Sequence, residues 1–165
     1  MKKLLILLCV LLPMGAMAQG VKIAYVKSQE VFTAMPELAN VESTMAKMEE
    51  DYKKELQQIQ DEFTKKYTVY ISQRDSLTDN IRLRREQELQ DIRERMDNFV
   101  QVAQQDTQKK QLEMIQPIQK KIQDAIKAVG TEKGYTYIID QANVLFINPN
   151  AEDATPLVRA KLGMK

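Results

Sequence analysis

Apolar side chains recur every three or four residues through the first half of the chain, from Leu38 to Tyr70. This spacing is that of one face of an α-helix and differs from the alternation of a strand. We predict a helix over residues 36–74, about 58 Å long, with Pro36 in its first turn, where a missing N–H costs little. The stripe comprises Leu38, Val41, Met45, Met48, Tyr52, Leu56, Ile59, Phe63, Tyr67 and Tyr70.

A polar segment, RDSLTDN at residues 74–80, breaks this pattern and offers several side chains that cap helices. A second helical stripe runs from Ile81 to Ala103, resumes at Ile115 and continues to Val129, after which Gly130 is expected to end the helix. The two helices are predicted to form a long antiparallel hairpin that turns near residues 75–80. A single uninterrupted rod is the alternative, and it requires the polar segment to remain helical.

Two features interrupt the second helix. Its stripe falters at residues 104–111, where Asp106 and Lys110 take the place of apolar residues. Either the packing weakens there and the hairpin flexes, or these residues face a solvent-filled cavity. Farther along, Pro117 removes one backbone hydrogen bond and predicts a kink.

Short strands are predicted at the two ends of this hairpin. VKIAYV at residues 21–26 is one, and GYTYIIDQANVLFIN at residues 134–148 contains two β-rich runs separated by polar residues. Ser28 and Thr155 are each expected to cap a short helix, the latter with Pro156 in its first turn. The hairpin returns the chain to its start, so the later strands should arrive beside residues 21–26. A small sheet with open edges invites pairing with other chains, and an oligomer with a shared β body is therefore predicted.

The first residues read as a secretory signal peptide. Lys2 and Lys3 precede nine apolar residues at 4–12, and Ala16, Met17 and Ala18 supply the small-x-small pattern before cleavage. We expect cleavage after Ala18 and export of the mature chain. An uncleaved anchor is the alternative, but nine apolar residues are too few to cross a bilayer.

Removal of this segment changes the composition. The whole chain has 24 basic and 23 acidic residues, and loss of Lys2 and Lys3 moves the formal net charge from +1 to −1 (22 − 23). A near-neutral exported chain is not expected to bind nucleic acid. The chain has no histidine, and its one cysteine is Cys9. This excludes Ser-His and Cys-His nucleophile pairs and the usual zinc ligand sets, so neither an enzyme, a metal site nor a cofactor is predicted.

The residues at both ends resemble the Skp (OmpH-like) family of periplasmic chaperones. The matching segments are KIAYVKSQEVFTAMPE at 22–37 and IQKKIQDAIKAVGTEKGYTYIIDQANVLFINPNAEDATPLV at 118–158. The resemblance implies a mainly α homotrimer with a small β-barrel body, from which helical hairpins project around a cavity. That cavity would hold unfolded outer-membrane proteins without ATP. The chain then divides into a signal peptide (1–18), body segments (19–35 and 130–165) and a hairpin (36–129).

The candidate functional residues fall into three sets. Candidates for contact with an unfolded client protein lie on the hairpin: Tyr67, Tyr70, Ile71, Leu77, Ile81, Leu83, Met96 and Phe99. Candidates for the trimer body are Ile23, Tyr25, Tyr137, Ile139, Val144, Phe146, Ile118 and Ile122. Arg82, Arg84 and Arg85 are candidates for contact with acidic lipid or lipopolysaccharide.

Two alternatives remain open at this stage. Six arginines face seven acidic residues over positions 71–97, and a solvated helix surface explains the three candidate arginines as well as an anion site does. An extracytoplasmic coiled-coil adaptor with one fixed protein partner would use the same stripe and the same β-mediated assembly. A chaperone should protect several unrelated clients, whereas an adaptor should bind one.

Overall fold

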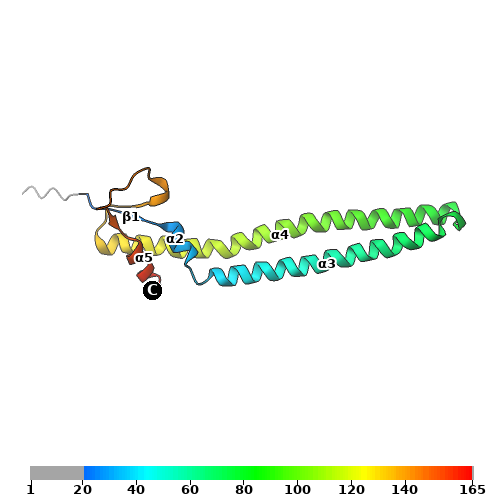
Figure 1. Cartoon of the computed structure of the whole chain (residues 1–165), viewed down its shortest axis with the longest axis horizontal. Coiled ribbons are helices and arrows are strands. Elements are labelled where there is room, and N and C mark those ends of the chain that lie inside the picture. The colour runs from blue at the N-terminus through cyan, green and yellow to red at the C-terminus, as the bar shows by residue number, and fades with distance from the viewer. Residues whose placement is uncertain (1–20, 165) are drawn as a thin grey trace, which may run out of the picture.

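A computed structural model describes residues 21–164 of the chain, so the predicted signal peptide and its cleavage point lie outside the described residues. A small α/β body lies at one end, and a long helical hairpin extends from it (Figure 1). The elements in chain order are β1 (Ile23–Val26), α2 (Ser28–Thr33), α3 (Leu38–Gln73), η1 (Arg74–Ser76), α4 (Asp79–Lys133), β2 (Tyr137–Asp140), η2 (Gln141–Asn143), β3 (Glu152–Asp153) and α5 (Thr155–Lys161).

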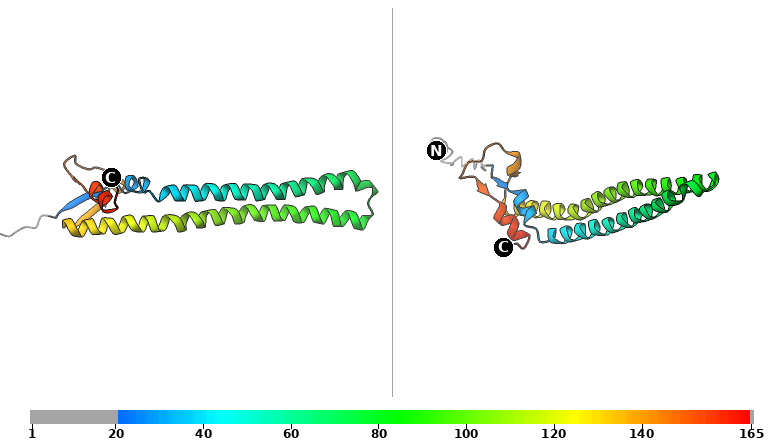
Figure 2. Two further views of the ribbon diagram at one scale, coloured as in Figure 1. Left: turned by 90° about the horizontal axis from the view of Figure 1, so that it is seen from below. Right: turned by 45° about the vertical axis from the view of Figure 1, so that its right-hand side comes forward.

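The structure confirms the two long helices that the helical period of the sequence predicted. Helix α3 has 36 residues and α4 has 55, which correspond to lengths of about 54 and 82 Å at the usual rise. The short 3-10 turn η1 and the extended residues Leu77 and Thr78 reverse the chain. The uninterrupted rod is therefore excluded. Further views show the two helices side by side along most of their length and curving together (Figure 2).

The end of α4 differs from the prediction. The helix continues past Gly130 to Lys133, and Gly134 adopts the left-handed conformation with φ of 66°. The N–H of Tyr135 donates to the carbonyl of Gly130 (3.0 Å), which completes a glycine-terminated helix end. Gly134, unlike Gly130, meets the requirement for positive φ. The helix is also uninterrupted at Pro117.

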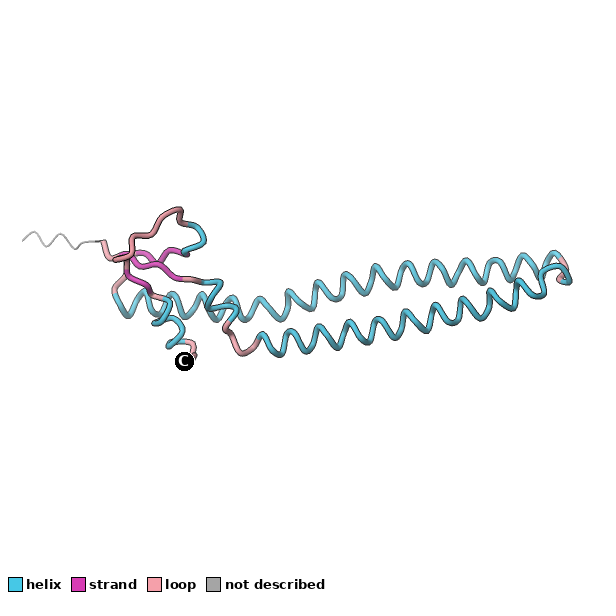
Figure 3. Tube along the Cα trace, in the orientation of Figure 1, coloured by secondary structure: helices cyan, strands magenta, loops and turns pink. Residues whose placement is uncertain are grey.

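The strands form a three-stranded parallel sheet in the order β2-β1-β3. In the register, Ile23 pairs with Tyr137 and Tyr25 with Ile139. The β-rich run at residues 144–147, which the sequence predicted to be a strand, is not one; the third strand is Glu152–Asp153 instead. Because β2 and β3 lie on opposite edges of β1, residues 141–151 must carry the chain across, and the tube view shows them as a projecting loop (Figure 3).

The predicted caps are replaced by bonds that join the elements of the body. Ser28 makes no cap; its hydroxyl donates to the carboxylate of Asp140, which ties α2 to β2. Asp153 Oδ1 accepts from the N–H of Thr155 at 2.8 Å, so Asp153 satisfies the start of α5. The Thr155 hydroxyl accepts from the N–H of Lys27 at 3.0 Å. These bonds tie the chain that leaves β1 to the end of β2 and to the start of α5.

The main core lies where the last turns of α4 pack against the sheet, α2 and α5. Val31 and Val158 are fully buried in it, and α4 supplies Ile118, Ile122, Ala125 and Val129. The inner face of the sheet adds Val26 and, partly buried, Ile138. No helix in the described part of the chain is long and apolar enough to span a membrane.

Candidate functional site

The outer face of the sheet is apolar and uncovered. Strand alternation sends Ala24 and Val26 inward, whereas Ile23, Tyr137 and Ile139 point outward with 49%, 61% and 40% of their surfaces exposed. Tyr25, on the same face, is half-buried. The register places these four predicted body residues together as two neighbouring cross-strand pairs. We call this group the outer sheet face.

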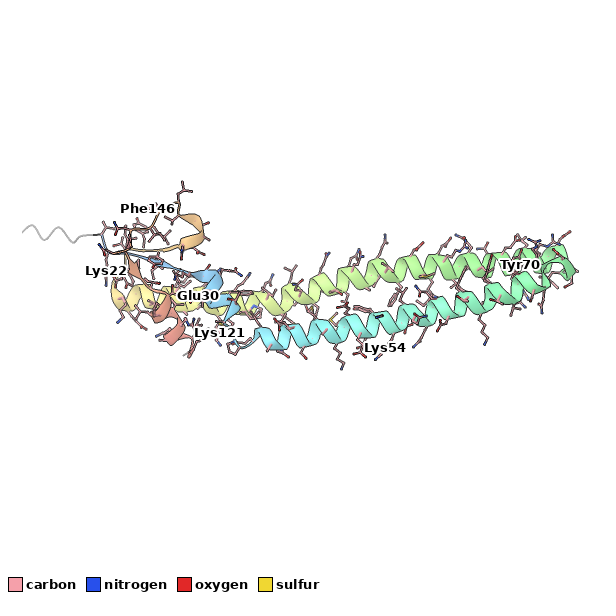
Figure 4. The ribbon with its side chains drawn as sticks, viewed as in Figure 1. Lys22, Glu30, Lys54, Tyr70, Lys121 and Phe146 are labelled. Carbon is pink, nitrogen blue, oxygen red and sulfur yellow. The ribbon has the colours of Figure 1, made fainter. Side chains whose placement is uncertain are left out.

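The loop beside this face exposes further apolar side chains. Leu145 is fully exposed and Phe146 is 75% exposed, while Val144 is half-buried in an extended conformation. Phe146 stands on the loop that projects from the body (Figure 4). Sequence reasoning named Val144 and Phe146 but not Leu145 between them, because alternate residues of a strand share a face. Since this segment is not in the sheet, both are exposed.

The other two predicted body residues have a different environment. Ile118 and Ile122 are 4% and 5% exposed and belong to the core of the single chain. They support the body from within. The outer sheet face and the loop, not these two residues, offer surface to another molecule.

One edge of the body is tied by a polar cluster. The Lys22 ammonium lies 4.3 Å from the centre of the Tyr135 ring and 3.6 Å from Glu152. The Tyr135 hydroxyl donates to Glu152, and burial together with this bond raises the pKa of Tyr135 to about 12. The phenol therefore stays neutral and keeps donating across physiological pH. The cluster links β1, β3 and the end of α4.

The tip of the hairpin exposes most of the predicted client-contact residues. Tyr67, Ile71, Ile81 and Leu83 are 44%, 49%, 40% and 66% exposed, and Leu77 is half-buried. Val69, at 43%, is a further exposed apolar residue of the tip and was missed because it lies off the helical stripe. We call these side chains, including Val69, the apolar tip.

Tyr70 does not belong to the apolar tip. It is 8% exposed and lies between the helices, where its hydroxyl donates to Glu86 (Figure 4). The helical stripe that led to its selection is the stripe that packs inside the hairpin. Tyr70 therefore offers little surface for contact with a client.

The remaining two client-contact residues, Met96 and Phe99, are half-buried in the middle of the hairpin. The Phe99 ring meets Tyr52 edge to face, with 6.0 Å between ring centres, and the Tyr52 hydroxyl donates to Asp106. Asp106, which takes the place of an apolar residue in the stripe, thus forms a hydrogen bond across the hairpin to α3. No described residue from 42 to 58 on α3 or from 93 to 117 on α4 is buried.

An open groove of about 650 Å³ lies between the helices at this level. Its apolar walls come from both helices, and its α4 rim is polar because the stripe falters at residues 104–111. We call it the mid-hairpin groove. The apolar wall residues are Met45, Tyr52, Leu56, Phe99, Val100 and Ala103.

The three candidate arginines are engaged in ion pairs within the hairpin. Arg84 and Arg85 lie 3.7 and 3.3 Å from the carboxylate of Glu88, and Arg82 lies 3.5 Å from Asp79. Lys66 on α3 also reaches Glu88, at 3.6 Å. One carboxylate thus faces three cations. This pairing lowers the positive charge that the surface offers to an anion.

Comparison with known proteins identifies the family. The family model "Outer membrane protein (OmpH-like)" matches residues 22–162. The chain is 31% identical over 137 residues to the chaperone protein Skp of Pectobacterium atrosepticum, covering 81% of each, and 30% identical over 155 residues to that of Photorhabdus luminescens, covering 87% and 86%. A crystal structure of an OmpH-like chaperone from Caulobacter crescentus matches the fold with a TM-score of 0.74 at 14% identity, covering 85% of this chain and 82% of that one. The chain therefore belongs to the Skp (OmpH-like) family of chaperones.

Proposed function

We propose that this protein is a periplasmic holdase chaperone that works without ATP. It binds unfolded outer-membrane β-barrel proteins between its helical hairpins and prevents their aggregation. The relatives named chaperone protein Skp support the class of activity. The observation that carries the proposal is the uncovered apolar surface at both ends of one chain, the outer sheet face with its loop and the apolar tip.

The body supports assembly into a homotrimer. The three-stranded sheet buries only one of its faces. The other face exposes Ile23 of β1 and Tyr137 and Ile139 of β2 to water. Contiguous exposed apolar patches of this kind mark interaction surfaces. In the proposed trimer, three such faces and three loops bearing Phe146 cover one another in a shared β-barrel. The hairpins then project from one side of that body.

The hairpin supports loose and varied client contact. Its surface alternates charges in i,i+4 pairs such as Glu50 with Lys54, 2.6 Å apart, which keep the helices solvated. Apolar side chains are gathered at the tip and half-exposed in the middle. Many weak apolar contacts hold an unfolded chain without fixing one sequence, and they release it without an energy source.

Aggregation assays with two unrelated unfolded outer-membrane proteins test this proposal. We expect equal trimer-to-client ratios to suppress light scattering for both clients. Suppression of only one client would favour the fixed-partner adaptor, and suppression of neither would overturn the proposal.

A matched pair of variants then tests the apolar tip. The double substitution Ile71→Ser and Leu83→Ser should raise the scattering of both clients. The double substitution Val102→Ser and Leu112→Ser, at residues 53% and 60% exposed on α4, should not. Equal effects of the two variants would remove the tip from the client-binding surface.

A further inference from the structure

The mid-hairpin groove is large for a pair of packed helices. Its volume of about 650 Å³ lies within the range of about 300–1,000 Å³ that is usual for ligand sites. Buried residues flank it, with Ile59 and Ile92 toward the tip and Val41 and Ile118 toward the body. Smaller hollows of about 340 and 380 Å³ also lie between α3 and α4, so the groove is the roomiest of these three openings in the hairpin.

The length of the groove suits an extended peptide. Its walls run from Met45 to Leu56 on α3 and from Phe99 to Gln111 on α4, so each wall is about 17 Å long at the helical rise. An extended chain advances about 3.3 Å per residue, so about five residues fit along it. Alternate side chains of such a segment point the same way, and two or three of them would face the groove.

The chemistry of the walls and rim selects a neutral, apolar segment. Tyr52, Leu56 and Phe99 give the floor large apolar surfaces, and Met45 can adjust its shape to different groups. Among the lining residues, Glu49 and Lys53 carry opposite charges that cancel. The α4 rim is formed by Gln104, Thr107, Gln108 and Gln111. Their amides and hydroxyl can both donate to and accept from the backbone of a bound peptide.

We propose that the mid-hairpin groove is a binding subsite for about five residues of an extended client segment with alternating apolar and polar side chains. The apolar side chains enter between α3 and α4, and the rim glutamines pair with the peptide backbone. This inference rests on the proposed chaperone function and assigns part of client binding to the inside of each hairpin. Segments of this alternating pattern are those that form β-strands with one apolar face.

Direct binding of a synthetic probe tests the subsite. The probe is a fluorescein-labelled ten-residue peptide of alternating phenylalanine and threonine, and its control has serine at every phenylalanine position. Fluorescence anisotropy with the processed chain should show binding of the first peptide and at least about tenfold weaker binding of the second.

Filling the groove is the decisive variant. Ala103→Phe places a ring in the groove, and we expect it to weaken probe binding at least about tenfold. Gln101→Phe adds the same ring at an exposed position outside the groove lining and should leave the affinity within about twofold. Circular dichroism checks that both variants stay folded. Unchanged probe binding by folded Ala103→Phe overturns the subsite.

A fluorescent label provides a second readout that does not depend on the filling variant. Gln108→Cys, labelled with an environment-sensitive dye on the processed chain, should show a blue shift with the phenylalanine peptide and none with the serine peptide. A shift produced instead by phosphatidylcholine vesicles alone, or by protein concentration alone, would assign the groove to lipid or to a second copy and overturn the inference. Aggregation suppression by the wild-type chain separates these outcomes from failure of the chaperone proposal.

Discussion

The buried residues of α4 near the body determine whether the single chain holds its shape. Ile122 is 5% exposed within the main core. We expect Ile122→Ala to lower the free energy of unfolding by about 2–5 kcal/mol, because lost burial and the remaining cavity both cost stability. Leu112→Ala, at a residue 60% exposed on the same helix, should change it by less than about 0.5 kcal/mol. Urea denaturation at one protein concentration compares the two, and equal losses would contradict this core.

The carboxylate of Glu88 controls the charge that the hairpin tip presents. It faces Lys66, Arg84 and Arg85, and Lys66 also lies 3.9 Å from Glu62, so Glu88→Gln should release the two arginines from pairing. A cation near an anionic surface contributes about 1 kcal/mol, and we expect stronger, salt-sensitive binding to phosphatidylglycerol vesicles. Glu42→Gln removes the same charge at an exposed position of α3 and serves as the control. Vesicle cosedimentation measures both, and identical behaviour would show that Glu88 does not mask the arginines.

At the scale of the elements, the ion pair of Glu37 and Lys121 joins the start of α3 to α4. The hydrogen bond from Lys121 is the main cause that lowers the pKa of Glu37 below its ordinary value of 4.5. A lowered folded-state pKa gives stability that is present above the ordinary value and is lost as the pH falls through the folded value. The Glu37 side chain is 38% exposed, so we expect at most about 1 kcal/mol.

The measurement is the free energy of unfolding of the wild type and of Glu37→Gln from about pH 6 to about pH 3. The difference between them should shrink toward the acidic end. A constant difference would show that the carboxylate form of Glu37 does not stabilise the hairpin base.

The middle of the hairpin should open more readily than the end of α4 that lies in the body. Residues 100–112 border the groove and none of them is buried, whereas Ile118, Ile122 and Val129 lie in the core. Sparse apolar burial lowers the free energy of local opening. We therefore expect the amides of residues 100–112 to exchange with solvent faster than those of residues 118–129. Equal protection of the two segments would show that packing in the middle of the hairpin is not weakened.

The elements also show what sequence alone could predict. A helical period repeated many times predicted both long helices. Their observed ends differ from the predicted ends by a few residues, because the sequence patterns the helical period strongly and the cap geometry only weakly. Strand β3 was missed because Glu152 and Asp153 carry no apolar alternation. Residues 144–147 were wrongly predicted to form a strand, because β-rich composition does not specify a partner strand. They lie in the connection that carries the chain from one edge of the sheet to the other.

The candidate site was predictable to a similar degree. Exposed tip residues such as Leu83 follow from apolar character at the turn of a hairpin. The burial of Tyr70 and the pairing of Lys66 with Glu88 depend on how α3 and α4 are aligned, which neither helix specifies by itself. Arg84 and Arg85 pair with Glu88 within α4, at i,i+4 and i,i+3 spacing. The only sign of the mid-hairpin groove in the sequence was the interruption of the apolar stripe at residues 104–111. The groove itself could not be predicted, because its volume depends on side chains of both helices.

At the scale of the whole molecule, a small body carries a much longer helical hairpin (Figure 1). Helix α4 belongs to both parts, since its last turns form the floor of the body core and the rest forms one arm. Assembly of several bodies would hold the arms at fixed mutual angles, which a single chain cannot do.

The assembly itself gives the last prediction. If the outer sheet face and its loop join copies of the chain, Tyr137→Ser combined with Phe146→Ser should remove apolar surface from every interface in the ring. Burial of apolar area contributes about 25 cal/mol per Å², and a ring repeats each loss at every interface. We expect the wild-type processed chain to sediment as a trimer at micromolar concentration and the double variant as a monomer with unchanged helical circular dichroism.

A matched double variant at the other end of the molecule separates assembly from general loss of apolar surface. Ile71→Ser with Leu83→Ser changes two residues that are 49% and 66% exposed at the tip, far along α3 and α4 from the sheet. It should sediment as a trimer. If the wild type is a monomer, or if both double variants remain trimers, the outer sheet face does not hold the assembly together. A chain that needs its copies to close the body also needs them to enclose a client, so loss of the trimer should abolish aggregation suppression as well.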